Sequence, residues 1–227
     1  MRAHINTLLA ILKWPSAIAS LLLLPGTVLA FIAELGSMID EATKILPFLL
    51  GIVIYAVTWA MLFRKPGFGS MLSTLEHEIT HSVFALLTLH PVTSLKTSWN
   101  KGGHMTFRGE GNWLIFIAPY FFPTLSVVVM LVTLGLDPEA LGWASGALGA
   151  TVSYHATSTW RETHRQQTDL QMVGFPFAAC FLPTANVVSF GLILSMARGG
   201  GAASSEFLST LWRHSSEFSA VITSAAG

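Results

Sequence analysis

One short stretch of the sequence combines residue types that can bind and use a metal ion, namely His77-Glu78-Ile79-Thr80-His81. On a helix, residues four apart lie on the same face one turn apart, so His77 and His81 can bind one Zn²⁺ together. Glu78 is rotated by about 100° from His77, so it need not bind the metal and can accept a proton from a water that the metal activates. The pattern predicts one zinc ion per chain, held by His77 and His81, with Glu78 as the general base.

A catalytic zinc usually has three protein ligands and one open position, so a third ligand must come from elsewhere in the chain. Asp169 stands at the N-terminal edge of an apolar run, where an aspartate also suits a helix N-cap. His155 is more typical of a hydrogen-bonded packing residue, and His164 of a solvated connector. His104 is expected to be exposed or to face a substrate. The residues alone leave these four alternatives open.

The composition indicates what surrounds this group. Of the 227 residues, 52% are hydrophobic and only 11% are charged, whereas soluble domains carry roughly 25% charged residues. The formal net charge is zero and there is no basic face, so we expect no nucleic-acid partner. Cys180 is the only cysteine, which excludes an internal disulfide and a cysteine-rich zinc site. These features favour a chain that is solvated mainly by lipid.

The apolar runs predict an all-α integral membrane protein of about six transmembrane helices, one of which could be re-entrant. Pro25 and Gly26 are expected to break the first span, which follows a short amphipathic lead-in over residues 5–13. Crossings by the third, fourth and fifth runs would start the helices of His77 and Asp169 on opposite faces. A fourth or fifth run that enters and returns would remove this conflict. The runs cover residues 16–33, 45–63, 70–89, 113–134, 141–160 and 170–196.

A polar stretch between the third and fourth runs, residues 91–111, alternates around Asn100-Lys101-Gly102-Gly103 and predicts a small β-hairpin. Residues 1–196 are expected to form a single membrane-embedded domain. Residues 197–227 follow as a linker, rich in glycine at Gly199–Gly201, and a short amphipathic tail that could lie along the membrane surface.

Lysine and arginine give the expected orientation of a multi-pass protein of the cytoplasmic membrane. Arg2 and Lys13 favour a cytoplasmic N-terminus, and Arg64-Lys65 falls on the same side two spans later. The third run then enters from the cytoplasm, so the basic residues of the hairpin fall on the far side and oppose this orientation. Those residues are Lys96, Lys101 and Arg108.

The third run carries four ionisable residues within six positions: Glu76, His77, Glu78 and His81. Each such group in the middle of a span costs on the order of 2.5–3.5 kcal/mol on insertion scales. Coordination of a metal can recover that cost, whereas packing gives no reason for the cluster. Glu76 is expected either to hydrogen-bond a ligand histidine or to face a water-filled entrance.

An H-E-x-x-H pattern inside an apolar run resembles the site-2 proteases, a family of intramembrane zinc metallopeptidases. Ala118-Pro119 is similar to the Ala-Gly-Pro element of that family, and the hairpin is similar to the sheet that holds its substrates. The resemblance implies that Asp169 is the third ligand. It also implies hydrolysis of a peptide bond in or near the transmembrane segment of a membrane-protein substrate.

The sequence departs from the family pattern around the third ligand. Gln167-Thr168-Asp169-Leu170-Gln171 lacks the asparagine and glycine that usually surround this aspartate, so Asp169 rests on its position more than on a motif. Thr80 replaces the usual glycine before the second histidine, and no inserted PDZ domain is evident. These differences describe a compact and divergent version of the pattern.

Peptide hydrolysis would require an unwound substrate segment, which could pair with a hairpin edge by strand addition. His104 or Asn112 could then bind the substrate and stabilise the oxyanion. One alternative is a non-hydrolytic membrane protein, either a metal transporter with further polar sites at His104, His155 and His164 or a scaffold for membrane partners. Another is a glutamate-dependent intramembrane protease that would use Glu76 without zinc.

Overall fold

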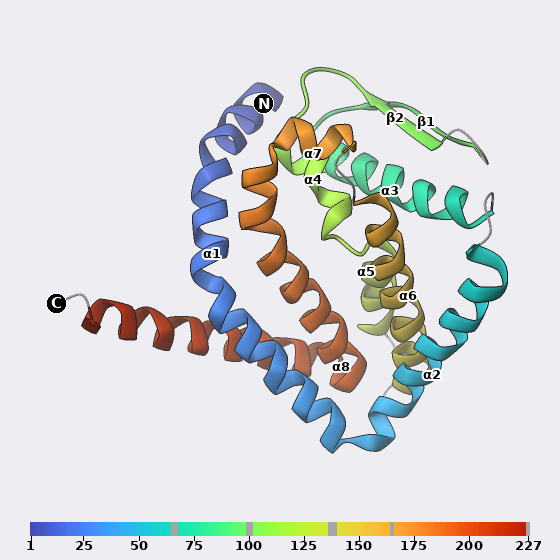
Figure 1. Cartoon of the computed structure of the whole chain (residues 1–227), viewed down its shortest axis with the longest axis vertical. Coiled ribbons are helices and arrows are strands. Elements are labelled where there is room, and N and C mark those ends of the chain that lie inside the picture. The colour runs from blue at the N-terminus through green and yellow to red at the C-terminus, as the bar shows by residue number, and fades with distance from the viewer. Residues whose placement is uncertain (65–67, 99–101, 136–139, 164–165, 226–227) are drawn as a thin grey trace.

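A computed structural model describes residues 1–64, 68–98, 102–135, 140–163 and 166–225, which are mostly helical and include one two-stranded antiparallel sheet (Figure 1). The first half of the chain contains α1 (Arg2–Asp40), α2 (Ala42–Thr58), the π-helical turn η1 (Trp59–Phe63), α3 (Phe68–Leu87), β1 (Val92–Ser98) and β2 (Gly102–Phe107). The second half contains α4 (Trp113–Ile117), the 3₁₀ turn η2 (Ala118–Tyr120), α5 (Thr124–Thr133), α6 (Leu141–Glu162), α7 (Thr168–Val173) and α8 (Phe175–Ala225).

Three helices of the described chain are long and apolar enough to cross a membrane: Arg2–Asp40, Ile45–Phe63 and Phe175–Val221. A fourth is possible if Trp113–Tyr120 and Thr124–Thr133, which are bent by 79° at the intervening residues, count together as one broken or re-entrant span. The expected six spans are therefore not confirmed. The bend does fall where Pro119 and Pro123 interrupt the run, since a proline cannot continue the hydrogen bonding of a helix.

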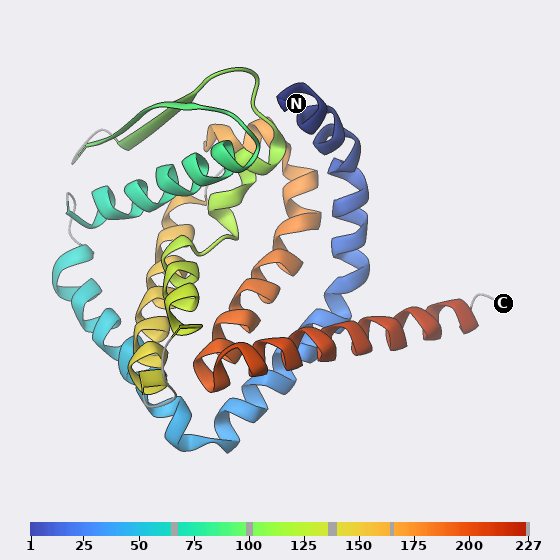
Figure 2. The same ribbon diagram turned by 180° about the vertical axis from the view of Figure 1, so that it is seen from behind.

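The third run forms a helix, but α3 lies crosswise to its neighbours instead of running alongside them (Figure 1). Three helices run away from the hairpin end, namely α1, α5 and the first part of α8. Between them, α2 and α6 run back toward it, and the reverse view shows the same order (Figure 2). α3 is not among the candidate spans and lies across the end of the other helices, so the conflict between the two faces, which assumed that the third run crosses, does not arise. Both α3 and α7 lie at the hairpin end.

The expected break of the first span is wrong, because α1 continues as a helix through Pro25 and Gly26 and includes the lead-in. Gly26 instead allows close helix packing. A Cβ at this position would lie 2.3 Å from Oγ of Ser215, a buried residue in the second part of α8. The two helices can cross here only because Gly26 has no side chain.

A glycine-rich linker was expected after the sixth run, and the structure has a bend there, because Gly199 and Gly200 have non-helical backbone angles inside α8. Gly200 has φ 65°, which favours glycine. The guanidinium of Arg198 donates to both carboxylate oxygens of Glu34 on α1, at 2.7 and 3.1 Å, and to Glu206 at 2.9 Å. These bonds hold the helical C-terminal part of the chain across α1.

Candidate metal centre

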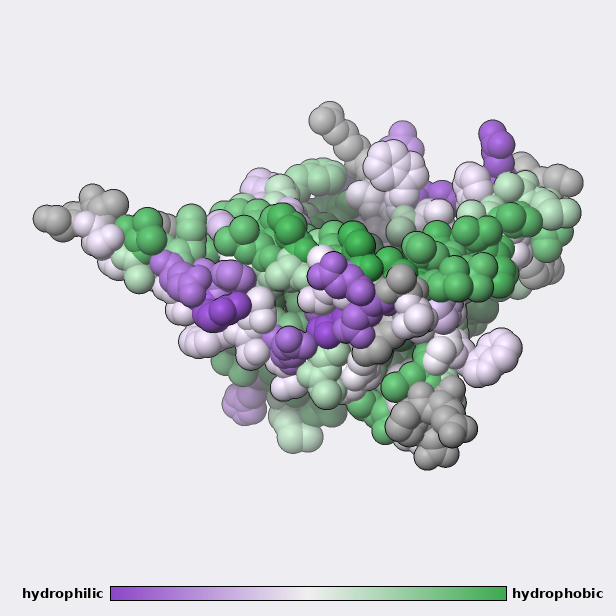
Figure 3. All heavy atoms as spheres, turned by 90° about the horizontal axis from the view of Figure 1, so that it is seen from below, coloured by the Kyte–Doolittle hydropathy of each residue, from purple (hydrophilic) through white to green (hydrophobic). Residues whose placement is uncertain are grey.

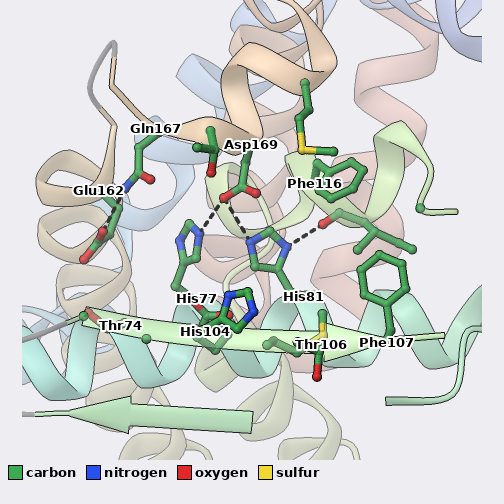
Figure 4. A pocket seen from close by; sticks show the side chains of 18 of the residues that line it. Thr74, His77, His81, His104, Thr106, Phe107, Phe116, Glu162, Gln167 and Asp169 are labelled. Carbon is green, nitrogen blue, oxygen red and sulfur yellow. Dashed lines mark hydrogen bonds and ion pairs between the residues drawn. The ribbon is translucent and has the colours of Figure 1, made fainter. Parts of the chain in front are cut away.

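His77, His81 and Asp169 meet at the hairpin end of the molecule (Figure 4). The two histidines are one turn apart on α3, and Asp169 lies in the first turn of α7. Nε2 of His77 is 3.3 Å from Oδ2 of Asp169, and Nε2 of His81 is 3.2 Å from the same oxygen. One ligand atom from each residue lies within 4.8 Å of the others, so this group could hold a metal ion. Of the three alternatives that the structure describes, Asp169, His155 and His104, Asp169 is the one that contacts both histidines.

Both imidazoles are oriented by other parts of the chain. Nδ1–H of His81 donates to the carbonyl oxygen of Ile115 at 2.7 Å, which directs Nε2 toward Asp169. The ring of Tyr120 packs edge-on against His77, with 5.4 Å between the ring centroids. A hydrogen bond on the far nitrogen is how proteins commonly fix a metal-binding histidine, so the group fits a metal centre by geometry as well as by residue type.

The charges of the group also suit a metal. Burial alone would raise the pKa of Asp169, but hydrogen bonds from His77 and His81 hold it well below its ordinary value. Asp169 is therefore a carboxylate, the form that binds metal ions. Burial raises the pKa of Glu78, although the neighbouring His81 and His77 oppose this shift. A raised pKa makes Glu78 a better proton acceptor than an exposed glutamate.

A cavity of about 600 Å³ opens over the three ligands and Glu78. One wall is β2, whose other edge pairs with β1 in register from Val92 opposite Phe107 to Ser98 opposite Gly102. Within the described residues, the sheet has only these two strands, so the edge of β2 toward the cavity has no strand partner. The predicted hairpin is thus confirmed, and His104 on β2 lines the cavity as an exposed residue.

Gly103 brings the backbone of β2 directly over Glu78. A Cβ at Gly103 would lie 2.5 Å from Cγ2 of Thr74 and 2.8 Å from Cγ of Glu78. No side chain fits at this position unless the side chains of Thr74 and Glu78, or the strand itself, are displaced. From the sequence, Gly102-Gly103 looks only like part of a turn, so this function of Gly103 was missed.

Glu162 and Gln167 also line the cavity, which their place in or beside a polar connector does not indicate. The Oε1 atom of Glu162 accepts a hydrogen bond from Ser73 of α3 at 3.2 Å. Its Oε2 atom accepts one from the amide nitrogen of Gln167 at 3.1 Å. Glu162 therefore links the end of α6 to α3 and to the segment that carries Asp169.

Other residues that the sequence singled out lie elsewhere. Asn112 is not among the described residues lining the cavity: it caps α4 by accepting from the amide of Ile115 at 3.2 Å, and it donates to Asn6 at 3.1 Å. His155 is buried in α6 beside Phe190, and His164 lies outside the described residues.

Glu76 points away from the cavity toward the start of α5. Its Oε1 atom accepts a hydrogen bond from the backbone amide of Leu125 at 3.4 Å. Burial raises the pKa of Glu76 to about 7, although the hydrogen bond opposes this shift. Glu76 forms no hydrogen bond or ion pair with the described rings of His77 and His81, and it does not line the cavity.

Comparison with known proteins adds no relative to this description. No protein-family model matches the chain, and no curated protein or solved structure is similar to it. The functional argument therefore rests on the residues and geometry of the metal group and its cavity.

Proposed function

We propose that this protein is a membrane-embedded, zinc-dependent endopeptidase in which Glu78 is the general base. One observation carries the proposal. Ligand atoms of His77, His81 and Asp169 lie within 4.8 Å of one another on the floor of a cavity that Glu78 also lines. This is the arrangement that a hydrolytic metal centre requires, namely three ligands, a base beside them and space for a substrate.

His77, His81 and Asp169 would hold the metal ion. When bound, the ion would polarise the substrate carbonyl and lower the pKa of a water. Glu78 accepts a proton from the attacking water and passes it to the nitrogen of the leaving amine. The C–N bond breaks, and the water supplies the new hydroxyl group of the acid and the new hydrogen of the amine.

The free edge of β2 supports an extended peptide as substrate. A segment that adds to this edge would form backbone hydrogen bonds with β2 and lie next to the metal group. Because Gly103 brings the strand so close to Glu78, a peptide paired there would present its backbone to the base. His104 is placed on the same strand to contact the side chains of the substrate, which we propose is a transmembrane protein.

The long apolar helices support a multi-pass protein of the cytoplasmic membrane, and its basic residues support a cytoplasmic hairpin end. Because α3 does not cross, the hairpin lies beside the N-terminus, where Arg2 donates to the carbonyl oxygen of Arg108 at 3.0 Å. The hairpin charges therefore favour the same orientation as Arg2. The elements at this end carry Arg2, Lys13, Arg64, Lys96, Arg108 and Arg161, whereas Lys44 belongs to the first turn of α2 and Arg198 and Arg213 belong to the bend and second part of α8, toward the other end.

The test uses protein purified without chelators, its metal content, and cleavage of a panel of single-span membrane proteins. Glu78→Gln is expected to keep the metal and lose cleavage, and His77→Ala to lose both. Glu217→Gln makes the same chemical change at an exposed position on the second part of α8, away from the cavity, and is expected to change neither. Full cleavage by Glu78→Gln would refute the role of Glu78, and a metal-free wild type would refute the proposal.

The panel also separates this proposal from a metal transporter. A transporter would need a second group of ligands along a path, but His77, His81 and Asp169 form the one such group in the part of the chain that the structure describes. A transporter would move Zn²⁺ into sealed vesicles and cleave nothing, whereas the endopeptidase cleaves without moving the ion.

A further inference from the structure

Three helices contain uncharged stretches of nearly equal length. No charged residue stands between Lys13 and Glu34 in α1, between Lys44 and Arg64 across α2 and η1, or from the start of α6 to Arg161. Each stretch has 19 or 20 residues, and at 1.5 Å per residue each is about 30 Å long. This length equals the thickness of the hydrocarbon core of a bilayer. Each of the three helices alone thus indicates an apolar layer of the same thickness.

Contacts between helices place the hairpin-side ends of these stretches together. Nη1 of Arg161 donates to the carbonyl oxygen of Phe63, the last residue before Arg64, at 3.4 Å. On the other side of the bundle, Nζ of Lys13 lies 5.3 Å from the centre of the Phe177 ring, just after α7. The ends of α1, η1 and α6 therefore mark one border of the layer.

The other border is marked by the ion cluster at the bend of α8. Glu34 binds Arg198 there, and a Cβ on Gly200 would contact Leu141, the first residue of α6. The molecule viewed from this end shows hydrophilic side chains gathered in the middle with hydrophobic ones around them (Figure 3).

Two tryptophans on α6 agree with these borders. Trp143 is 86% exposed and Trp160 is 84% exposed, and they stand near opposite ends of the helix about 25 Å apart along its axis. Tryptophan gathers at the two interfaces of a membrane. Although α6 is not among the apolar candidate spans, it packs against α2, α5 and α8, so only part of its surface would meet lipid.

The metal group lies at the hairpin-side border. Glu162 follows Arg161 directly, lines the cavity and binds Ser73 of α3. Asp169 belongs to α7, which precedes Phe177 at the same border. The crosswise helix α3 lies along this border with exposed apolar side chains such as Leu86, as expected of a helix in a membrane interface.

We infer that the metal group is at the membrane border and that the bond it cleaves lies in the segment next to a substrate's transmembrane helix, not in the middle of that helix. The position of the cut rests on the proposed function, whereas the depth of the metal group does not. At the border, an extended substrate segment keeps access to water, so its backbone groups need not be exposed to hydrocarbon.

Spin labels can measure this depth without any activity. Single cysteines replace Met172, Trp160, Trp143 and Ile54 in a Cys180→Ala background, in vesicles of phosphatidylcholine and phosphatidylglycerol. Met172 is exposed and lines the cavity, and Ile54 is exposed at the middle of the α2 stretch. We expect the label at Met172 to match that at Trp160, with contact to a water-soluble nickel chelate, and the label at Ile54 to contact dissolved oxygen instead.

A Met172 label as deep as the Ile54 label would overturn the placement, whatever the activity. Mass spectrometry of the cleaved single-span substrates tests the position of the cut. Cuts within about one helical turn of the border support the inference, and cuts near the middle of the span overturn it. An inactive, metal-loaded protein with a shallow Met172 label would refute the endopeptidase while leaving the placement intact.

Discussion

The close approach of β2 to Glu78 predicts that Gly103→Ala impairs catalysis without loss of metal. The backbone of Gly103 has no positive φ, so alanine can adopt it, and the effect of the substitution is purely steric. The new Cβ would lie 2.5 Å from Thr74 and 2.8 Å from Glu78, whereas ordinary contact begins at 3.4 Å. The strand, or the side chains of Thr74 and Glu78, must therefore move by about 0.6 to 0.9 Å. A displacement near 1 Å can reduce a catalytic rate about 100-fold, so we expect a loss of about 10- to 100-fold.

The assay is the initial rate of cleavage of the single-span substrate identified with the wild type, alongside zinc content. Gly142→Ala is the matched control, because a Cβ there would meet nothing within 4 Å. Thr74→Ser removes the methyl group at 2.5 Å, so the double variant is expected to recover part of the rate. Full activity of Gly103→Ala, or loss of zinc with the rate, would refute the reasoning that the strand positions Glu78.

Three further predictions concern stability in detergent. Asn112→Ala removes the N-cap of α4 and should lower the free energy of unfolding, measured by thermal unfolding, by about 1 kcal/mol. An unchanged melting temperature would contradict a stabilising role of this cap. Burial places the pKa of Glu76 at about 7, above its ordinary 4.5, so ionisation of Glu76 destabilises the fold as pH rises from 4.5 to 7. The free energy of unfolding of Glu76→Gln should therefore exceed that of the wild type by about 3 kcal/mol at pH 8 and equal it at pH 4. A difference that does not change with pH would exclude ionisation of Glu76 as the cause. Arg198→Ala leaves Glu34 buried without its partner and should lower the free energy of unfolding by about 3–5 kcal/mol. Arg213→Ala should lower it far less, and equal losses of stability in the two variants would argue against the ion pair.

Local patterns predicted local structure well. The H-E-x-x-H spacing placed His77 and His81 on one helical face because that relation depends only on helix geometry. The alternation around the glycines predicted the hairpin, and Gly199–Gly201 predicted the bend in α8. In each case the residues that determine the structure are neighbours in the sequence.

Features that depend on distant partners were beyond the sequence. Hydropathy measures how apolar a helix is, and it carries no information on whether α3 runs through the bundle or across its end. Likewise, Gly26 looks like a helix break until Ser215 is seen packed against it. In the sequence, only the position of Asp169 favoured it as the third ligand, because its contact with the histidines arises from the packing of α7 near α3.

The pairing of Glu34 with Arg198 also bears on how the protein is made. The two residues are 164 positions apart, so at 5–20 residues per second the ribosome needs about 10–30 s to supply the arginine after the glutamate. During that interval α1 has already been synthesised, while the helix that covers Gly26 and neutralises Glu34 does not yet exist. The first helix is therefore without these contacts during that interval, and its packing against the C-terminal helix is one of the last steps of assembly.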